Sequence, residues 1–204
     1  VRPLVVFMLA LVSLVVGRIA EGQDKSLLWK ISDDKNSVFL LGSIHYLRKK
    51  NYPLNQAILD AFDGSKTLVL EIDLNSTAAE AAQRLTLEKA VYRDGTTLAQ
   101  NVAPETYQLA AQRAKELGVD MRIMNPMKPW FVALTLVAIK LQSLGLDANS
   151  GVDRYLAQRA KNNGKATRGL ETLEFQIGLL DQLPKTDQEQ MLRETVRELD
   201  LLDK

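Results

Sequence analysis

Polar side chains that can act as acids, bases or metal ligands stand at or just beyond the ends of three apolar, strand-like segments of the chain. They are His45, Glu71, Asp73 and Glu171. Open α/β sheets gather functional residues at the carboxyl ends of their strands, so these four are expected to lie at one edge of a sheet. Imidazole and carboxylate groups there can hold a divalent metal ion and lower the pKa of its bound water. Without a metal, His45 can act as a base and Glu71 as an acid or an orienting partner.

His45 is the only histidine in 204 residues, and it lies just beyond a continuous apolar run, Val38–Leu41. Such a run is typical of a strand that is buried on both faces. Gly42 follows and allows the backbone to turn without a Cβ clash. A titratable imidazole at this place predicts a functional site. In the alternative interpretation, His45 only hydrogen-bonds to a loop or caps a helix.

Two carboxylates share one face of the predicted strand 67–73 (TLVLEID). Side chains alternate along a strand, so Glu71 and Asp73 point to the same side as Val69. A carboxylate is costly to desolvate unless it is paired or bound to a cation. A salt bridge to a nearby Lys or Arg would explain Glu71 alone. A metal or catalytic role is favoured because a neighbouring strand is expected to end at His45.

A short basic run, Arg48 to Lys50, follows His45. Three consecutive basic residues are usually solvated, but they can also hold an anionic group of a substrate. Arg48 is therefore a candidate binding residue together with Gly42 and Asp73.

The other elements predict an α/β fold, with α+β as the alternative, in which helices flank a mixed central sheet. We expect strands at 27–31, 37–44, 67–73, 119–124 and 165–170. We expect helices at 53–62, 76–93, 104–117, 130–144 and 153–161, one after Thr172 as cap, and one that Thr186-x-x-Glu189 opens as a capping box. The nearly uncharged helix 130–144 is too short to cross a membrane comfortably and is expected to be buried and to line a pocket; an interfacial or membrane-dipping role is the alternative.

Residues 1–22 are predicted to form a signal peptide or signal-anchor. Arg2 precedes an apolar stretch of 13 residues, Leu4 to Val16, and small residues follow at Gly17 and Ala20. The expected location is therefore exported, periplasmic or membrane-anchored, with membrane contact only through an uncleaved signal. Residues 23–204 form the folded domain. The alternative is a buried N-terminal element.

Composition excludes several classes of protein and site. The chain carries 26 Lys and Arg against 25 Asp and Glu, so its net charge of +1 gives no field to recruit nucleic acid. The absence of cysteine excludes disulfides, thiolate metal ligands and a cysteine nucleophile.

Several blocks of the chain, in order, resemble the TraB/PrgY/GumN family. They are LLWKIS, FLLGSIHYLRKKNYPL, TLVLEIDL, NPMKPW and GVDRYLAQRAKNNGKATRGLETLEFQ, and they cover most of residues 27–183. This family is related to the Tiki metalloproteases and, more distantly, to the erythromycin esterase and ChaN-like proteins. Its hallmark is a pair of Gly-x-x-His motifs with an acidic residue after the first. Gly42-Ser43-Ile44-His45 matches the first motif and Glu71 the acid, while Glu171 matches a second acidic position.

The resemblance implies an exported metal-dependent hydrolase, peptidase-like, with a peptide or small-molecule substrate. His45 and Glu71 would be the metal ligands and, with Glu171, the catalytic residues; manganese, cobalt and zinc are the candidate ions. Members usually place a second Gly-x-x-His further towards the C-terminus, and this chain has none, so the domain is expected to be incomplete there. The alternative function is a non-catalytic periplasmic protein that binds a ligand or partner in the same cleft. The substrate and the oligomeric state stay open.

Overall fold

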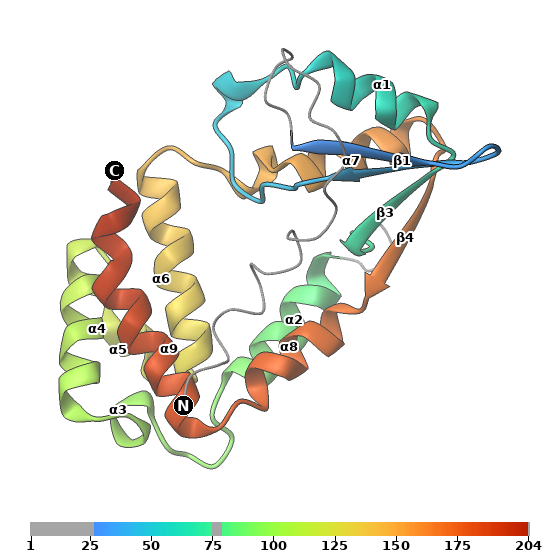
Figure 1. Ribbon diagram of the computed structural model, residues 1–204. Coiled ribbons are helices and arrows are strands. Elements are labelled where there is room, and N and C mark those ends of the chain that lie inside the picture. Colours follow the sequence, from blue (N-terminus) through green and yellow to red (C-terminus); the bar gives the residue numbers. More distant parts are fainter. Residues whose placement is uncertain (1–26, 75–78, 204) are drawn as a thin grey trace.

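The computed structural model describes residues 27–74 and 79–203 and combines small sheets with flanking helices (Figure 1). The α/β class predicted from the sequence is confirmed. The signal segment predicted for residues 1–22 lies outside the described residues. The α-helices are α1 (Gln56–Gly64), α2 (Ala79–Ala90), α3 (Leu98–Asn101), α4 (Pro104–Glu116), α5 (Met121–Met124), α6 (Pro129–Ser143), α7 (Val152–Asn162), α8 (Leu173–Asp181) and α9 (Lys185–Glu198).

The strands of the described residues form two separate two-stranded sheets instead of one central mixed sheet. β1 (Leu28–Ser32) and β2 (Ser37–Leu41) make the expected antiparallel hairpin. β3 (Thr67–Ile72) and β4 (Ala166–Glu171) pair in parallel, with Ile72 opposite Glu171. The expectation that the strand before His45 neighbours β3 is therefore wrong, because β2 pairs with β1 and β3 with β4.

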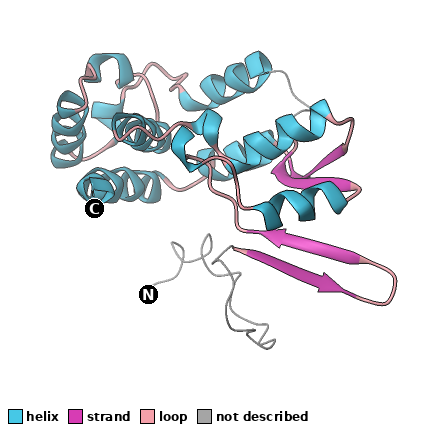
Figure 2. Ribbon diagram, turned by 90° about the horizontal axis from the view of Figure 1, so that it is seen from above, coloured by secondary structure: helices cyan, strands magenta, loops and turns pink. Residues whose placement is uncertain are grey.

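One face of the hairpin is apolar and open to solvent. Trp29 lies opposite Leu40, and Ile31 lies opposite Val38, so these four side chains share that face. Their exposures run from 46% for Trp29 to 56% for Ile31 and Val38. The prediction that Val38–Leu41 is buried on both faces is therefore wrong, since only alternate residues of β2 point inward. In Figure 2 the hairpin projects away from the helices.

A small core holds the ends of β2 and β3 against α1 and α7. Its buried members are Phe62, Val152, Leu156 and Ala160. Leu41 from β2 and Leu68 from β3 pack against them, as does Leu47 from the loop that follows His45. Burial of Leu47 in this cluster helps to hold the His45 loop against α7.

A larger helical layer lies on the other side of the molecule, where α4, α5, α6 and α9 are neighbours (Figure 1). Its core contains Leu98, Val132, Leu136, Leu192 and Val196, each with no exposed surface. α2 and α8 lie side by side between this layer and the parallel strands (Figure 1). The capping of α8 by Thr172 is confirmed, because its side chain accepts a hydrogen bond of 3.1 Å from the Phe175 N–H.

The predicted apolar helix is α6, and its burial is confirmed on one side: Trp130, Val132 and Leu136 are buried. The opposite side is partly open, since Leu134 is 44% exposed. Among residues 27–74 and 79–203, no helix combines the length and the hydropathy that crossing a membrane requires.

The predicted strand 119–124 is wrong, because residues Met121–Met124 form the short helix α5. Asp120 caps it and accepts a 2.9 Å hydrogen bond from the Arg122 N–H. Met121 and Met124, three residues apart, are the buried side chains of this segment. The apolar residues therefore follow the helical period and not the alternation of a strand.

The predicted capping box of the last helix is also wrong. Pro184 is the N-cap of α9, and the Glu189 carboxylate turns to a different helix. Its Oε1 accepts hydrogen bonds from the Ala103 N–H at 2.9 Å and from Thr106 Oγ1 at 2.8 Å. Glu189 thus satisfies the free N–H at the start of α4 and ties α4 to α9.

Replacing Glu189 with alanine is expected to lower the free energy of unfolding by about 2 kcal/mol, because it leaves the buried Thr106 hydroxyl and a helix N–H without an acceptor. Urea unfolding followed by circular dichroism measures the change. Glu198→Ala, on the exposed side of the same helix, is the control and should change stability by less than about 0.5 kcal/mol. Equal stability of the two variants would show that the Glu189 contact contributes nothing.

Candidate functional site

His45 lies in a loop that is fastened to the start of α7. The Ile44 carbonyl accepts a 2.9 Å hydrogen bond from the Val152 N–H. Two residues after His45, Leu47 and Asp147 exchange backbone hydrogen bonds of 2.9 and 3.3 Å. His45 is held between these two attachments, so its backbone position depends on residues about a hundred positions away in the sequence.

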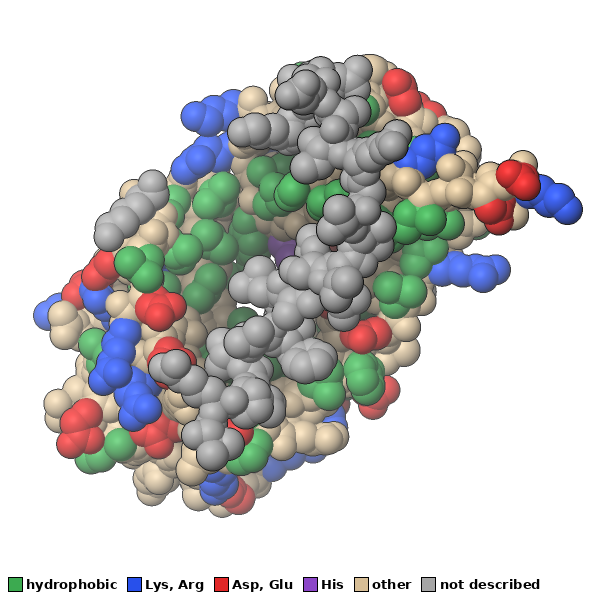
Figure 3. All heavy atoms as spheres, viewed as in Figure 1, with side chains coloured by type: hydrophobic (Ala, Val, Ile, Leu, Met, Phe, Trp, Pro, Cys, Tyr) green, Lys and Arg blue, Asp and Glu red, His purple; other side chains and the backbone are tan. Residues whose placement is uncertain are grey.

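The His45 side chain contacts a carboxylate that the sequence did not single out. Its Nδ1 lies 3.1 Å from Oδ2 of Asp153, in the first turn of α7. The imidazole is 62% exposed and the Asp153 side chain only 19%. The histidine side chain is visible at the surface among hydrophobic side chains in Figure 3, where it is purple. An imidazole held by a carboxylate on one nitrogen, with the ring open to solvent, is suited to bind a metal or to accept a proton.

Gly151 permits the close approach of α7 to His45. A Cβ at this position would lie 2.4 Å from the His45 carbonyl oxygen and 2.8 Å from Oδ1 of Asp153. Gly151 has an ordinary extended backbone, so space and not conformation requires glycine here.

Tyr52, in the loop after His45, ties that loop to the residues just before α7. Its hydroxyl donates a 2.8 Å hydrogen bond to the Ser150 carbonyl, and its ring lies 4.8 Å from that of Tyr155. Burial is the main cause that raises the pKa of the Tyr52 phenol, and the charge of Asp153 adds to it. Tyr52 therefore remains a neutral donor at physiological pH.

The three predicted carboxylates lie at the carboxyl ends of β3 and β4, apart from the contacts of His45. Glu71 is exposed, and its carboxylate has no hydrogen bond or ion pair with any described residue. Asp73 accepts a 3.0 Å hydrogen bond from Thr167 Oγ1, and Glu171 accepts one of 3.2 Å from Gln176 Nε2. Asp73 and Glu171 thus bond to different elements, the start of β4 and α8. The joint site of His45 and Glu71 stays a prediction.

Gly42 and Arg48, the other predicted binding residues, both make structural contacts. The Gly42 N–H donates to the Leu27 carbonyl at 2.8 Å, and a Cβ on Gly42 would lie 3.0 Å from that of Leu27. The Arg48 guanidinium donates two hydrogen bonds, of 3.1 and 3.3 Å, to the Leu144 carbonyl at the end of α6. Arg48 thus caps α6, and the binding of a substrate anion by Arg48 stays a prediction.

A complete metal site is not formed by the described residues. Across residues 27–74 and 79–203, no three His, Asp or Glu side chains are close enough together to hold an ion. His45 offers one imidazole ligand, and the carboxylate beside it is that of Asp153.

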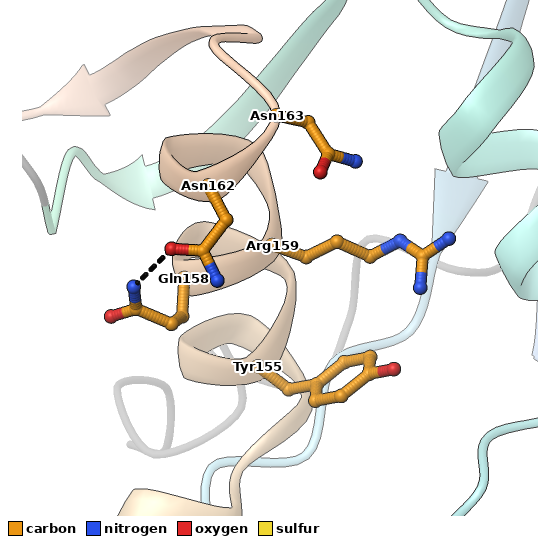
Figure 4. Close-up of a pocket in the computed structure, with 5 residues that line it drawn as sticks. All are labelled: Tyr155, Gln158, Arg159, Asn162 and Asn163. Carbon is orange, nitrogen blue, oxygen red and sulfur yellow. Dashed lines mark hydrogen bonds between the residues drawn. The ribbon is translucent and has the colours of Figure 1, made fainter.

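A shallow polar pocket of about 390 Å³ lies along α7, from Tyr155 to its C-terminal end (Figure 4). It is lined by Tyr155, Gln158, Arg159, Asn162 and Asn163. Gln158 and Asn162 bond to each other, and Arg159 is paired with Asp63 at 2.8 Å. The pocket contains no carboxylate or imidazole of its own, so we assign no chemistry to it.

Asp153 and Gly151 were not predicted as site residues from the sequence. Both stand in the block GVDRYL, where a glycine and an acidic residue open a helix. An acidic residue in a first helical turn is ordinarily explained by the helix dipole, so its contact with His45 had no local signal.

Comparisons with known proteins identify relatives of this chain. The model of the TraB/PrgY/gumN family matches residues 27–204. The uncharacterized protein YbaP of Escherichia coli (strain K12) is 30% identical over 145 residues, which are 71% of this chain and 52% of YbaP. YbaP of Shigella flexneri matches to the same extent. An uncharacterized protein of Treponema pallidum (strain Nichols) is 25% identical over 174 residues, 82% of this chain and 50% of its own.

The chain thus spans about half the length of the curated relatives it matches. No solved structure matches the chain.

Proposed function

The chain belongs to the TraB/PrgY/gumN family, and we propose that it carries part of the active site of an exported, peptidase-like hydrolase whose reacting group is His45. One observation supports this role above the others. The only imidazole of the chain is largely exposed, and a mostly buried carboxylate lies 3.1 Å from its Nδ1. That leaves Nε2 as the nitrogen that can react.

His45 can serve hydrolysis in two ways. As a base, Nε2 would accept the proton of a water that attacks a carbonyl carbon. As a metal ligand, the same nitrogen would bind a divalent ion such as zinc, manganese or cobalt, which lowers the pKa of its bound water. Glu71 is the second proposed ligand, and Glu171 is a further catalytic candidate. The described residues do not form a group of three metal ligands. The role as a base is therefore the simpler one, because it needs no further ligand.

A binding protein without catalysis is the second candidate. The incomplete ligand set and the apolar face of Trp29, Ile31, Val38 and Leu40 favour it, because exposed apolar patches commonly mark binding surfaces. This candidate predicts neither hydrolysis nor metal binding, and no effect of His45 replacement on a partner that contacts the hairpin.

Replacing His45 with alanine is expected to abolish hydrolysis of a mixture of fluorogenic peptides, because it removes the only imidazole of the chain. Calorimetry with zinc, manganese and cobalt on the same proteins then separates the two roles. Metal binding by the unchanged protein that His45→Ala eliminates identifies a ligand; hydrolysis without metal binding identifies a base. Glu71→Ala tests the second ligand in the same titration.

Glu194→Ala, an acidic position on α9 remote from the site, is the control for both measurements. Absence of both hydrolysis and metal binding in the unchanged protein would overturn the hydrolase and leave the binding protein.

A further inference from the structure

We propose that Asp153 is the positioning residue of His45: its carboxylate fixes the proton of the neutral imidazole on Nδ1 and so presents the lone pair of Nε2 to solvent. The use of that lone pair in hydrolysis rests on the proposed function, whereas the arrangement itself does not. The assignment follows from one contact, from the local packing and from a comparison with other acidic residues of the chain.

The contact decides which nitrogen carries the proton. Oδ2 of Asp153 is 3.1 Å from Nδ1 of His45. An ionised carboxylate can only accept hydrogen bonds, so the imidazole nitrogen that faces it has to be the donor. In a neutral ring the other nitrogen is then unprotonated, and it is the one that can take up a proton or bind a cation.

Asp153 is the second residue of α7, after the N-cap Gly151, and it does not act as a cap in the way that two other aspartates do: Asp120 is the N-cap of α5, and Asp147 is the N-cap of the short 3-10 turn Ala148–Ser150. Asp120 and Asp147 each accept a bond from a backbone N–H two residues ahead, at 2.9 and 2.8 Å. Asp153 accepts none from its own helix within the described structure, and its hydrogen-bond partner is His45. Capping of α7 therefore does not explain this side chain.

The second oxygen of Asp153 is left without a partner. Oδ1 is buried and has no hydrogen bond among the described residues. An unpaired buried oxygen opposes folding, and a residue that keeps one needs an explanation other than stability. Orientation of His45 supplies that explanation. The backbone bond from Val152 to Ile44 and the tight approach of Gly151 hold the two side chains in place.

The single histidine makes the proposal directly testable, because ¹⁵N-histidine labelling gives the signals of one ring only. Long-range ¹H–¹⁵N correlation spectra are recorded on the metal-free full chain, at a pH where the imidazole is neutral. The expected spectrum shows Nδ1 protonated and Nε2 unprotonated. In Asp153→Ala, both ¹⁵N shifts should move towards each other as the two tautomers mix.

Two further variants keep the result interpretable. Asp153→Leu has the branching of aspartate without an acceptor, and it replaces Asp153→Ala if that variant does not fold. Asp187→Ala removes an acidic residue from the first turn of α9 and should leave the His45 spectrum unchanged. A proton on Nε2 in the unchanged protein, or identical spectra with and without Asp153, would overturn the proposal.

Failure here is distinguishable from failure of the proposed function, because the spectra require neither metal nor substrate. If His45 is a metal ligand, calorimetry should also show zinc affinity about 10–100-fold weaker in Asp153→Ala, the usual effect of losing the partner of a ligating histidine. A fixed tautomer in a protein that neither binds metal nor hydrolyses peptides would overturn the proposed hydrolase function and support the positioning role of Asp153.

Discussion

Replacing Leu136 with alanine is expected to lower the free energy of unfolding by about 3 kcal/mol, within the range of roughly 2–5 kcal/mol for buried leucines. Leu136 has no exposed surface, and it lies on α6 in the core that α4 and α9 complete. Removal of its side chain loses transfer free energy and leaves a cavity that the three helices fill only in part. For a chain of this size the melting temperature should fall by roughly 6–12 °C.

Leu134 gives a matched control on the same helix. It stands two residues before Leu136 and is 44% exposed, so Leu134→Ala removes the same atoms from a half-solvated site. Its cost should stay under about 1 kcal/mol, since alanine also favours the helix slightly more. Urea titrations of both variants measure the difference. Similar losses at the two positions would contradict the orientation of α6 described here.

The side of α6 that is buried could not be predicted from its sequence. Residues 130–144 are apolar nearly all round, and such a pattern predicts burial without naming a face. The hairpin, β3, β4 and the longer helices were predicted near their observed places because their apolar periods and end residues are local signals. The structure of residues 119–124 was predicted wrongly, because a short apolar run fits either a strand or a helical turn. The N-cap Asp120 favours the helical turn.

The candidate site, too, could be predicted from the sequence only in part. Glu71 and Glu171 lie at the ends of β3 and β4, His45 follows β2, and these positions are visible along the sequence. The pairing of strands is not local, so the expectation that His45 and Glu71 end neighbouring strands failed when β2 and β3 fell into different sheets. The contact with Asp153 joins positions 108 residues apart. No periodicity or motif within either segment determines which carboxylate a lone histidine meets.

Replacing Gly151 with alanine is expected to destabilise the protein by about 2–3 kcal/mol, the upper part of the range for overpacking. The added Cβ would lie 2.4 Å from the His45 carbonyl oxygen and 2.9 Å from its carbonyl carbon. These are backbone atoms, so no side-chain rotation relieves the clash. Either the His45 loop or the start of α7 has to move, and the contact between His45 and Asp153 depends on both.

Gly64 gives the matched control for this substitution. It is the last residue of α1, and an added Cβ there meets nothing within 4 Å. Gly64→Ala should be neutral or slightly stabilising, because alanine loses less backbone entropy in a helix. Urea unfolding compares the two variants, and the ¹⁵N spectrum of His45 shows whether its proton remains on Nδ1. Gly151→Ala with the stability of Gly64→Ala and an unchanged His45 spectrum would mean that the close approach of α7 does not hold the imidazole in place.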